Sequence, residues 1–97
     1  MMKRLVAGAL ALGLLTGPVL AGAPTAAQKA EFYKVCMGIA QNDTLCSCKR
    51  DAVDKLIDED FMTMVIASMK GKAPPADQNV PYNDYIAQSN AVCIPGY

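Results

Sequence analysis

Apolar residues recur at three- and four-residue spacing in four segments of this chain, with polar residues between them. That spacing places the apolar side chains on one side of a helix, and no segment shows the strict alternation that is typical of a β-strand. The pattern predicts helices over residues 26–41, 45–57, 59–70 and 81–93. We therefore expect an all-α fold, a small bundle of about four helices.

Residues that favour helix starts stand before these segments. Thr25 and Gln28 form a capping-box pattern at the start of the first helix. Asp58 can cap the third helix, and the acidic residues after it favour the positive end of the helix dipole. Pro81 suits the first turn of the fourth helix, with Asn79 nearby as a cap.

The first 21 residues have the three-part layout of a signal peptide. Lys3 and Arg4 are followed by an apolar stretch over residues 5–15 and by a small-residue cleavage pattern that ends at Ala21. A proline follows Ala23, which disfavours a cut there, so we expect cleavage after Ala21. The apolar stretch is well short of the roughly 20 residues that span a bilayer, which argues against a membrane anchor.

The predicted mature chain, residues 22–97, has room for a single helical domain. It keeps seven basic and nine acidic residues, because Lys3 and Arg4 leave with the leader. This slightly negative charge argues against nucleic acid as a partner and against a polybasic membrane-binding surface. The chain has no histidine, the commonest general base and metal ligand. We expect a bacterial protein of the periplasm, or a secreted one.

Four cysteines follow the leader: Cys36, Cys46, Cys48 and Cys93. An even number of cysteines in a small exported chain indicates structural disulfides. Residues two apart on a helix point about 200° apart, so Cys46 and Cys48 should face different neighbours, the first and the fourth helix. With a turn at residues 42–44, Cys48 matches the depth of Cys36 in the hairpin better than Cys46 does. This favours Cys36–Cys48 with Cys46–Cys93, and Cys36–Cys46 with Cys48–Cys93 is the close alternative.

Either pairing constrains the topology. Cys46 and Cys48 lie at the start of the second helix, whereas Cys93 lies at the end of the fourth. The fourth helix must therefore run antiparallel to the second, which requires a long return connection. Residues 71–80 can supply this crossover loop, because ten residues span up to roughly 33 Å and the third helix rises only about 18 Å.

A second interpretation of the cysteines is a copper site. Cys46 and Cys48 form a Cys-x-Cys pair, and thiolates with methionine thioethers suit Cu(I). The methionines available are Met37, Met62, Met64 and Met69. Methionine at core spacing usually fills gaps in the core, and an oxidised cysteine pair cannot bind metal. A thiol-redox site usually has two residues between its cysteines. We therefore expect no metal and no cofactor.

Asp58, Glu59 and Asp60 form an acidic cluster, with Asp51 and Asp54 one or two turns before it. Hydrolases use carboxylate pairs, so these residues are candidates for acid–base catalysis. Capping of the third helix and solvation of the second helix explain the same residues more simply. We expect no catalytic residue and a protein that is not an enzyme.

The third predicted helix is apolar around well over half of its circumference, which is more than a single buried stripe requires. Part of that surface can contact a partner protein, because methionine-rich apolar faces serve adaptable recognition. Tyrosines of the fourth helix add aromatic contacts of the kind enriched at interfaces. The candidate contact residues are Phe61, Met62, Val65, Ile66, Met69, Tyr82 and Tyr85. The competing interpretation makes the third helix the central helix of the bundle.

An amphipathic helix that ends at Cys93 follows a loop with Pro74 and Pro75. In this layout the last third of the chain resembles small exported all-helical proteobacterial proteins, including periplasmic immunity proteins that neutralise secreted toxins. The resemblance implies a protein partner, assigns no role to an individual residue and leaves the oligomeric state open. We expect a non-enzymatic protein-binding accessory, inhibitor or immunity protein, or chaperone-like factor, which makes contact through the third helix and residues 71–82. The alternative is a periplasmic carrier of copper or of a small apolar ligand, with its pocket between the third and fourth helices.

Overall fold

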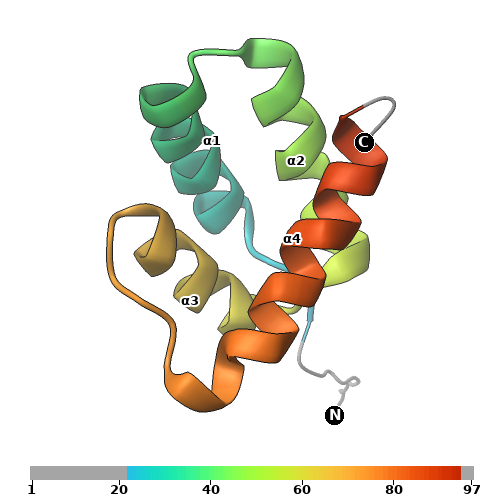
Figure 1. Ribbon diagram of the computed structural model, residues 1–97. Helices are drawn as coiled ribbons and strands as arrows, with labels where there is room; N and C mark the ends of the chain where they lie inside the picture. The colour runs from blue at the N-terminus through green and yellow to red at the C-terminus, as the bar shows by residue number, and fades with distance from the viewer. Residues whose placement is uncertain (1–21, 95–97) are drawn as a thin grey trace, which may run out of the picture.

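The computed structural model describes residues 22–94, and within this range the chain forms four α-helices, one short 3₁₀-helix and no strand. In chain order the elements are α1 (Ala26–Ala40), α2 (Asp43–Leu56), α3 (Glu59–Met69), the 3₁₀-helix η1 (Ala76–Gln78) and α4 (Asn79–Cys93) (Figure 1). The predicted all-α fold is confirmed. The predicted signal peptide, residues 1–21, lies outside the described residues, as do residues 95–97.

α1 and α2 form an antiparallel hairpin with a connection of two residues. Thr25 and Gln28 make the predicted capping box: the Thr25 hydroxyl accepts from the Gln28 amide at 3.0 Å, and the Gln28 side chain accepts from the Thr25 amide at 2.9 Å. Gln41 ends α1 in the left-handed conformation, with a φ of 53°. Asn42 then caps α2, because its side chain accepts from the Leu45 amide at 3.0 Å. α2 therefore begins two residues earlier than predicted.

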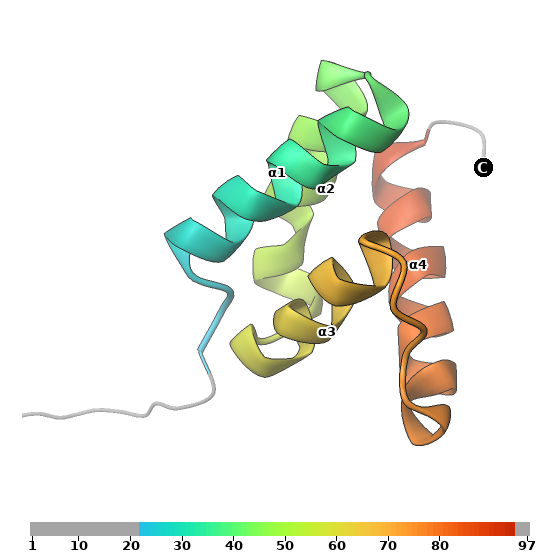
Figure 2. The ribbon, with the colours of Figure 1, turned by 90° about the vertical axis from the view of Figure 1, so that its left-hand side faces the viewer.

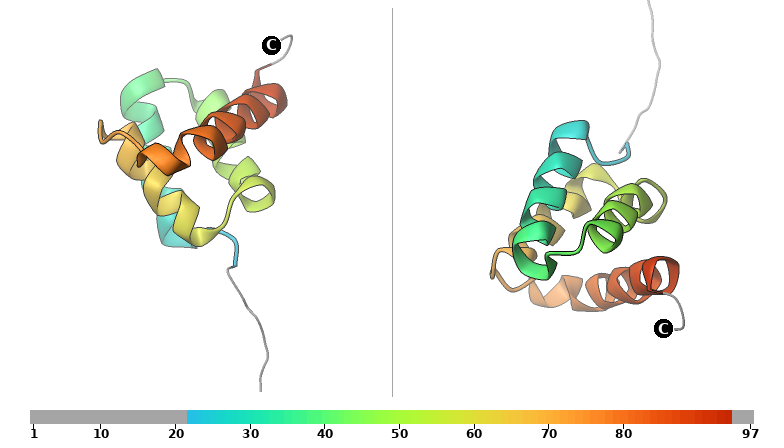
Figure 3. Two further views of the ribbon diagram at one scale, coloured as in Figure 1. Left: turned by 60° about the horizontal axis from the view of Figure 1, so that its bottom comes forward. Right: turned by 90° about the horizontal axis from the view of Figure 1, so that it is seen from above.

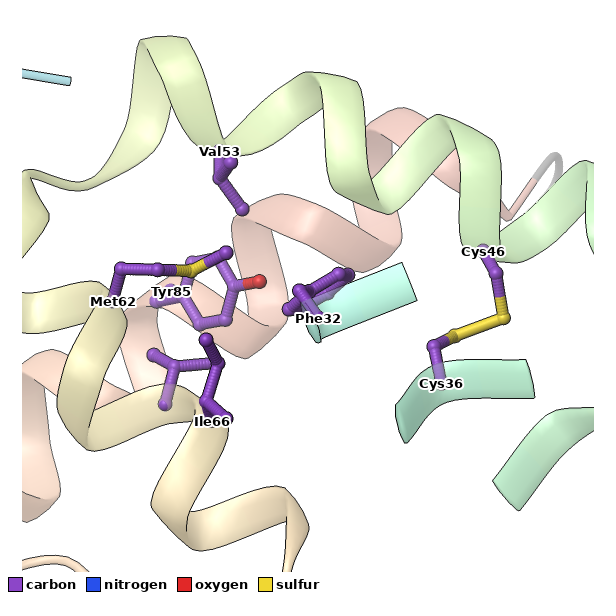
Figure 4. Packing of buried hydrophobic residues seen from close by; sticks show 8 residues of the cluster. Phe32, Cys36, Cys46, Val53, Met62, Ile66 and Tyr85 are labelled. Atoms are coloured by element: carbon purple, nitrogen blue, oxygen red, sulfur yellow. A yellow bond between two sulfur atoms is a disulfide. The ribbon is translucent and has the colours of Figure 1, made fainter. Parts of the chain in front are cut away.

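The core lies where the inner sides of the four helices meet. Figure 4 shows Phe32, Met62, Ile66 and Tyr85 gathered around one centre, with Val53 of α2 directed toward them. The buried apolar residues are Phe32, Cys36, Cys46, Val53, Met62, Val65, Ile66 and Tyr85. Each large apolar side chain buried in this way contributes roughly 1.5–3 kcal/mol relative to an exposed one. α3 supplies three of these residues, and α2 is the central helix, because it packs on both α1 and α4.

The residues before α1 pack against the start of α3. Pro24 is buried, and the Gly22 carbonyl accepts a hydrogen bond from the Glu59 amide at 3.0 Å. The Gln28 side chain donates to the Glu59 carbonyl at 2.9 Å and to the Thr63 hydroxyl at 3.1 Å. These bonds fix the first turn of α1 against the first turn of α3.

α4 runs antiparallel to α2, as predicted. Cys48 near the start of α2 is bonded to Cys93 at the end of α4, while Leu56 at the end of α2 and Pro81 in the first turn of α4 line one hollow. Figure 2 shows the connection after α3 passing back along α4 to the start of that helix. In Figure 3 α4 lies as one rod across one side of the other three helices. Asn79 is the first residue of α4 and not its cap, because η1 leads into α4 without a break, so α4 begins two residues earlier than predicted.

Two disulfides join the helices: Cys36–Cys46 links α1 to α2, and Cys48–Cys93 links α2 to α4. The favoured pairing, Cys36–Cys48 with Cys46–Cys93, is therefore wrong, and the close alternative is correct. The error follows from the early start of α2. With the turn at residues 41–42, Cys46 and Cys48 are almost equally matched in depth to Cys36. The direction of the side chain then decides which cysteine pairs with Cys36. Cys46 points into the hairpin and is fully buried, so it forms this bond.

The disulfides also indicate the kind of environment in which the protein occurs. All four cysteines are oxidised, which is typical of proteins in an oxidising, extracellular environment. None of the helices within residues 22–94 combines the length and the apolar character that crossing a bilayer demands.

Candidate functional site

The seven predicted contact residues divide into two groups in the structure. Four of them belong to the core: Met62, Val65, Ile66 and Tyr85. A partner cannot reach these four side chains, so they are core residues and not contact residues. The competing interpretation, in which α3 is the central helix, is nevertheless wrong, because α2 is the helix that packs on both α1 and α4. The other three are half-buried and pack against the edge of the core: Phe61, Met69 and Tyr82.

The outer side of α3 borders three adjoining hollows, together termed the α3 groove. The first hollow, of about 340 Å³, lies between the end of α2, α3 and α4. The second, of about 370 Å³, lies between α3 and η1 and shares Asp58 and Phe61 with the first. The third, of about 280 Å³, shares Asp60, Met64 and Pro75 with the second. The lining of the groove includes Ile57, Asp58, Asp60, Phe61, Met64, Lys72, Pro75, Pro81 and Asp84.

Phe61 and Met64 form the apolar floor of the groove. They are three residues apart on α3, so their side chains lie about one turn apart on the same side of the helix. The Asp58 side chain caps α3 by accepting a hydrogen bond from the Phe61 amide at 2.8 Å, which fixes the turn that carries Phe61. The Phe61 ring meets the Tyr85 ring edge-on, with centroids 6.3 Å apart. Phe61 is thereby held against the core while part of its ring remains accessible from the groove.

The groove is acidic. Within the described residues, each of the four carboxylates on α1 and α2 is paired with a cation or a hydroxyl group of the chain. No carboxylate after α2 forms an ion pair there, and five such residues follow α2: Asp58, Glu59, Asp60, Asp77 and Asp84. Three of them, Asp58, Asp60 and Asp84, line the groove, and its lining contains a single cation, Lys72 of the third hollow, so carboxylates predominate.

A polar network lies inside the packing of α2 on α4. The Lys49 ammonium donates to the Ser89 hydroxyl at 3.0 Å and to Asn90 Oδ1 at 2.6 Å. Ser89 is fully buried and also hydrogen-bonds with Tyr85. Burial lowers the pKa of Lys49 below its usual value and raises the pKa of Tyr85 to about 12. Because its polar groups hydrogen-bond to one another between two helices, this network holds α4 on α2.

A second polar cluster lies at the surface of the α1–α2 hairpin. The Asp43 carboxylate accepts hydrogen bonds from the Tyr33 hydroxyl and, at 3.2 Å, from the Ser47 hydroxyl. The Arg50 guanidinium lies 5.2 Å from the centre of the Tyr33 ring, which is a cation–π contact. The hydrogen bond with Asp43 raises the pKa of Tyr33. The hydrogen bonds from Tyr33 and Ser47 lower the pKa of Asp43. These contacts join the two helices, which is a structural role.

The cysteines considered for copper binding and two of the carboxylates considered for catalysis form disulfides and ion pairs. Cys46 and Cys48 are both in disulfides, so the thiolates that a copper site requires are absent from this fold. Among residues 22–94, histidine, cysteine and acidic side chains nowhere gather in threes as a metal site would need. Asp51 pairs with Arg50 at 3.0 Å, and Asp54 pairs with Lys29 across to α1 at 2.9 Å.

Several groove residues escaped the sequence prediction. Met64 was recognised as apolar but not as a contact residue, although its position three residues after Phe61 was a usable signal. Pro75 lies within residues 71–82, which the sequence analysis expected to make contact, whereas Asp84 carried no such signal. Both residues reach the groove because the connection after α3 turns back toward the start of α3 and brings α4 alongside. The sequence does not reveal the path of this connection, so the position of Asp84 could not be predicted.

Comparison with known proteins adds no relative. No protein-family model, no curated protein and no solved structure matches this chain.

Proposed function

We propose that this chain is an exported, non-enzymatic helical domain that binds another protein through the α3 groove, as an accessory subunit, an inhibitor or immunity protein, or a chaperone-like factor. The placement of Phe61 and Met64 carries this proposal. Both are large apolar residues that remain partly exposed above hollows, although α3 already supplies three residues to a filled core. Contiguous apolar recesses of this kind mark interaction sites on small proteins.

Export is part of the same proposal. The two disulfides require an oxidising compartment, and the periplasm provides one. A cut after Ala21 keeps Gly22, whose carbonyl accepts the hydrogen bond from the Glu59 amide, whereas a cut after Ala23 would remove it. Residues 1–21 would then be a signal peptide. The intact mass of the protein from the export compartment should correspond to a chain that begins at Gly22 with both disulfides formed.

Site-specific photo-crosslinking in the producing cell tests the protein-binding role. A photoreactive residue replaces Met64 in the groove, and in a matched protein it replaces Val92, an apolar residue of α4 that is 62% exposed and outside the groove. We expect a discrete protein adduct from position 64 and none from position 92. The adduct should disappear in a Phe61→Asp background that keeps the helical circular dichroism signal. Equal adducts at both positions, or none at position 64, would contradict the proposal.

A carrier of a small apolar ligand is the second candidate, and the first hollow favours it. This hollow lies between α3 and α4, where the sequence placed the pocket of such a carrier, and its 340 Å³ falls within the range of small-molecule sites. Native mass spectrometry separates the two roles. A bound small molecule that is lost in Phe61→Asp would support the carrier, and an unliganded mass together with the position-64 adduct would support protein binding.

A further inference from the structure

We infer that the partner presents a cationic amphipathic helix to the α3 groove. This inference rests on the proposed function and names the chemistry of the partner. The apolar floor, Phe61 and Met64, lies among the carboxylates of Asp58, Asp60 and Asp84. Any partner that covers the floor brings its own polar groups close to these carboxylates, so their charge selects the partner.

The fold accounts for only part of this acidity. Asp58 caps α3, and Asp60 lies in the first turn of α3, where it interacts favourably with the helix dipole. Asp84 has no such role: it lies in the second turn of α4, is exposed and forms no ion pair within residues 22–94. Yet Asp58 and Asp84 come from different helices and border the same hollow. A cationic side chain of a partner, placed in this hollow, would interact favourably with both carboxylates.

The charge is also unevenly distributed over the molecule. Residues 57–94 contain five carboxylates and two lysines. Lys70 is paired with Glu31 of α1, and Lys72 lines the third hollow, where it offsets one of the three carboxylates of the groove. Residues 22–56 contain four carboxylates and five cations. The small net charge of the mature chain thus conceals a negative region around the groove. Such a region attracts a cationic partner and repels an anionic one.

The spacing of the floor favours a helix as the bound element. Phe61 and Met64 are separated by about 4.5 Å along the axis of α3, with hollows between and beside them. A partner helix with apolar residues at positions i, i+3 or i+4, and i+7 offers side chains at similar steps, which is the helix-in-groove mode of recognition. Lysines or arginines beside those apolar residues would lie near Asp60 and Asp84.

Two model helices of about 18 residues test the charge preference. One contains leucine and lysine, the other leucine and glutamate at the same positions, and each is titrated with the protein purified from the export compartment. Fluorescence anisotropy gives the affinity, and amide chemical shifts give the site. We expect the lysine helix to bind about tenfold more tightly than the glutamate helix and to shift the signals of Phe61 and Met64. This preference should shrink with added salt.

Paired variants separate groove charge from net charge. Asp60→Asn with Asp84→Asn removes two charges from the groove, and Glu31→Gln with Asp51→Asn removes two charges elsewhere. The first pair should weaken binding of the lysine helix about tenfold, and the second pair should leave it unchanged. Equal losses, no binding of the lysine helix, or no preference between the helices would overturn the inference.

The two experiments distinguish failure of the cationic partner from failure of protein binding through the groove. A protein adduct from position 64, combined with no preference for the lysine helix, would leave the proposed function in place and remove the cationic partner. The absence of that adduct would contradict the proposed function itself.

Discussion

Met62 and Met64 are two residues apart on α3 and lie in opposite environments. Met62 is 0% exposed within the core, whereas Met64 lines two hollows of the α3 groove. Two residues of an α-helix turn the side chain by about 200°, so one short methionine-rich segment has an inner and an outer apolar side. The inner side holds the bundle together, and the outer side is available for contact.

Alanine substitutions should separate these two sides. Met62→Ala removes a fully buried side chain and leaves a cavity, so we expect the free energy of unfolding to fall by about 2–4 kcal/mol. Met64→Ala removes a partly exposed side chain and should cost about 1 kcal/mol or less. Urea denaturation followed by circular dichroism measures both. Similar losses for the two variants would contradict the two-sided assignment of α3.

Part of the structure of α3 could be predicted from the sequence. Its periodicity and the cap at Asp58 located the helix, and its surplus of apolar residues indicated a second apolar side. Whether a given apolar side chain of α3 is buried depends on where α1 and α4 pack against this helix. Met62 and Met64 are the same residue type in the same helix, and only tertiary packing distinguishes them.

The disulfide pairing shows a different limit. Cys46 and Cys48 were correctly expected to face different helices, because that follows from helix geometry alone. The choice between them depended on the position of one turn, and the Asn42 cap moves that turn toward α1. A shift of two residues in a helix start was enough to exchange the partners.

Removal of the Cys48–Cys93 bridge should release α4. This bridge closes a separation of 45 residues, so the loop-closure model gives a loss of roughly 4 kcal/mol in the double alanine variant. Hydrogen exchange of α4 amides should rise more than that of α1 amides. The matched variant without Cys36–Cys46 loses a bridge over 10 residues and should show the larger rise in α1. A uniform rise along the chain in both variants would show that the bridges do not act locally.

Tyr85 should make the fold sensitive to alkali. Burial raises its pKa from 10.0 to about 12, so above pH 10 the unfolded chain loses this proton more readily than the folded chain. The stabilising contribution, on the order of 3 kcal/mol, is complete below pH 10 and is lost as the pH rises toward the folded value. Tyr85→Phe lacks the ionisable group. The difference in free energy of unfolding between the two proteins should therefore be constant at neutral pH and change only above pH 10.

Lys49 should act in the opposite direction. Burial lowers its pKa from 10.5, so between the folded value and 10.5 the unfolded chain binds more protons than the folded chain. The free energy of unfolding contributed by this group therefore rises with pH in that window. Lys49→Met keeps most of the side-chain volume and removes the titration. The stability of the natural protein relative to this variant should increase as the pH rises from neutrality toward 10.5, and a flat difference would indicate a solvated ammonium.

Shortening the segment before α1 should lower the free energy of unfolding stepwise, because each shorter chain loses a further contact with the start of α3. A chain that begins at Pro24 lacks the Gly22 carbonyl and leaves the Glu59 amide without its partner, which should cost about 1 kcal/mol relative to a chain that begins at Gly22. A chain that begins at Thr25 also loses the buried Pro24 and should be destabilised further. Urea denaturation of the three chains measures these steps. If all three were equally stable, the contacts of Gly22 and Pro24 with the start of α3 would carry no energy, and the preference for a cut after Ala21 would lose its structural support.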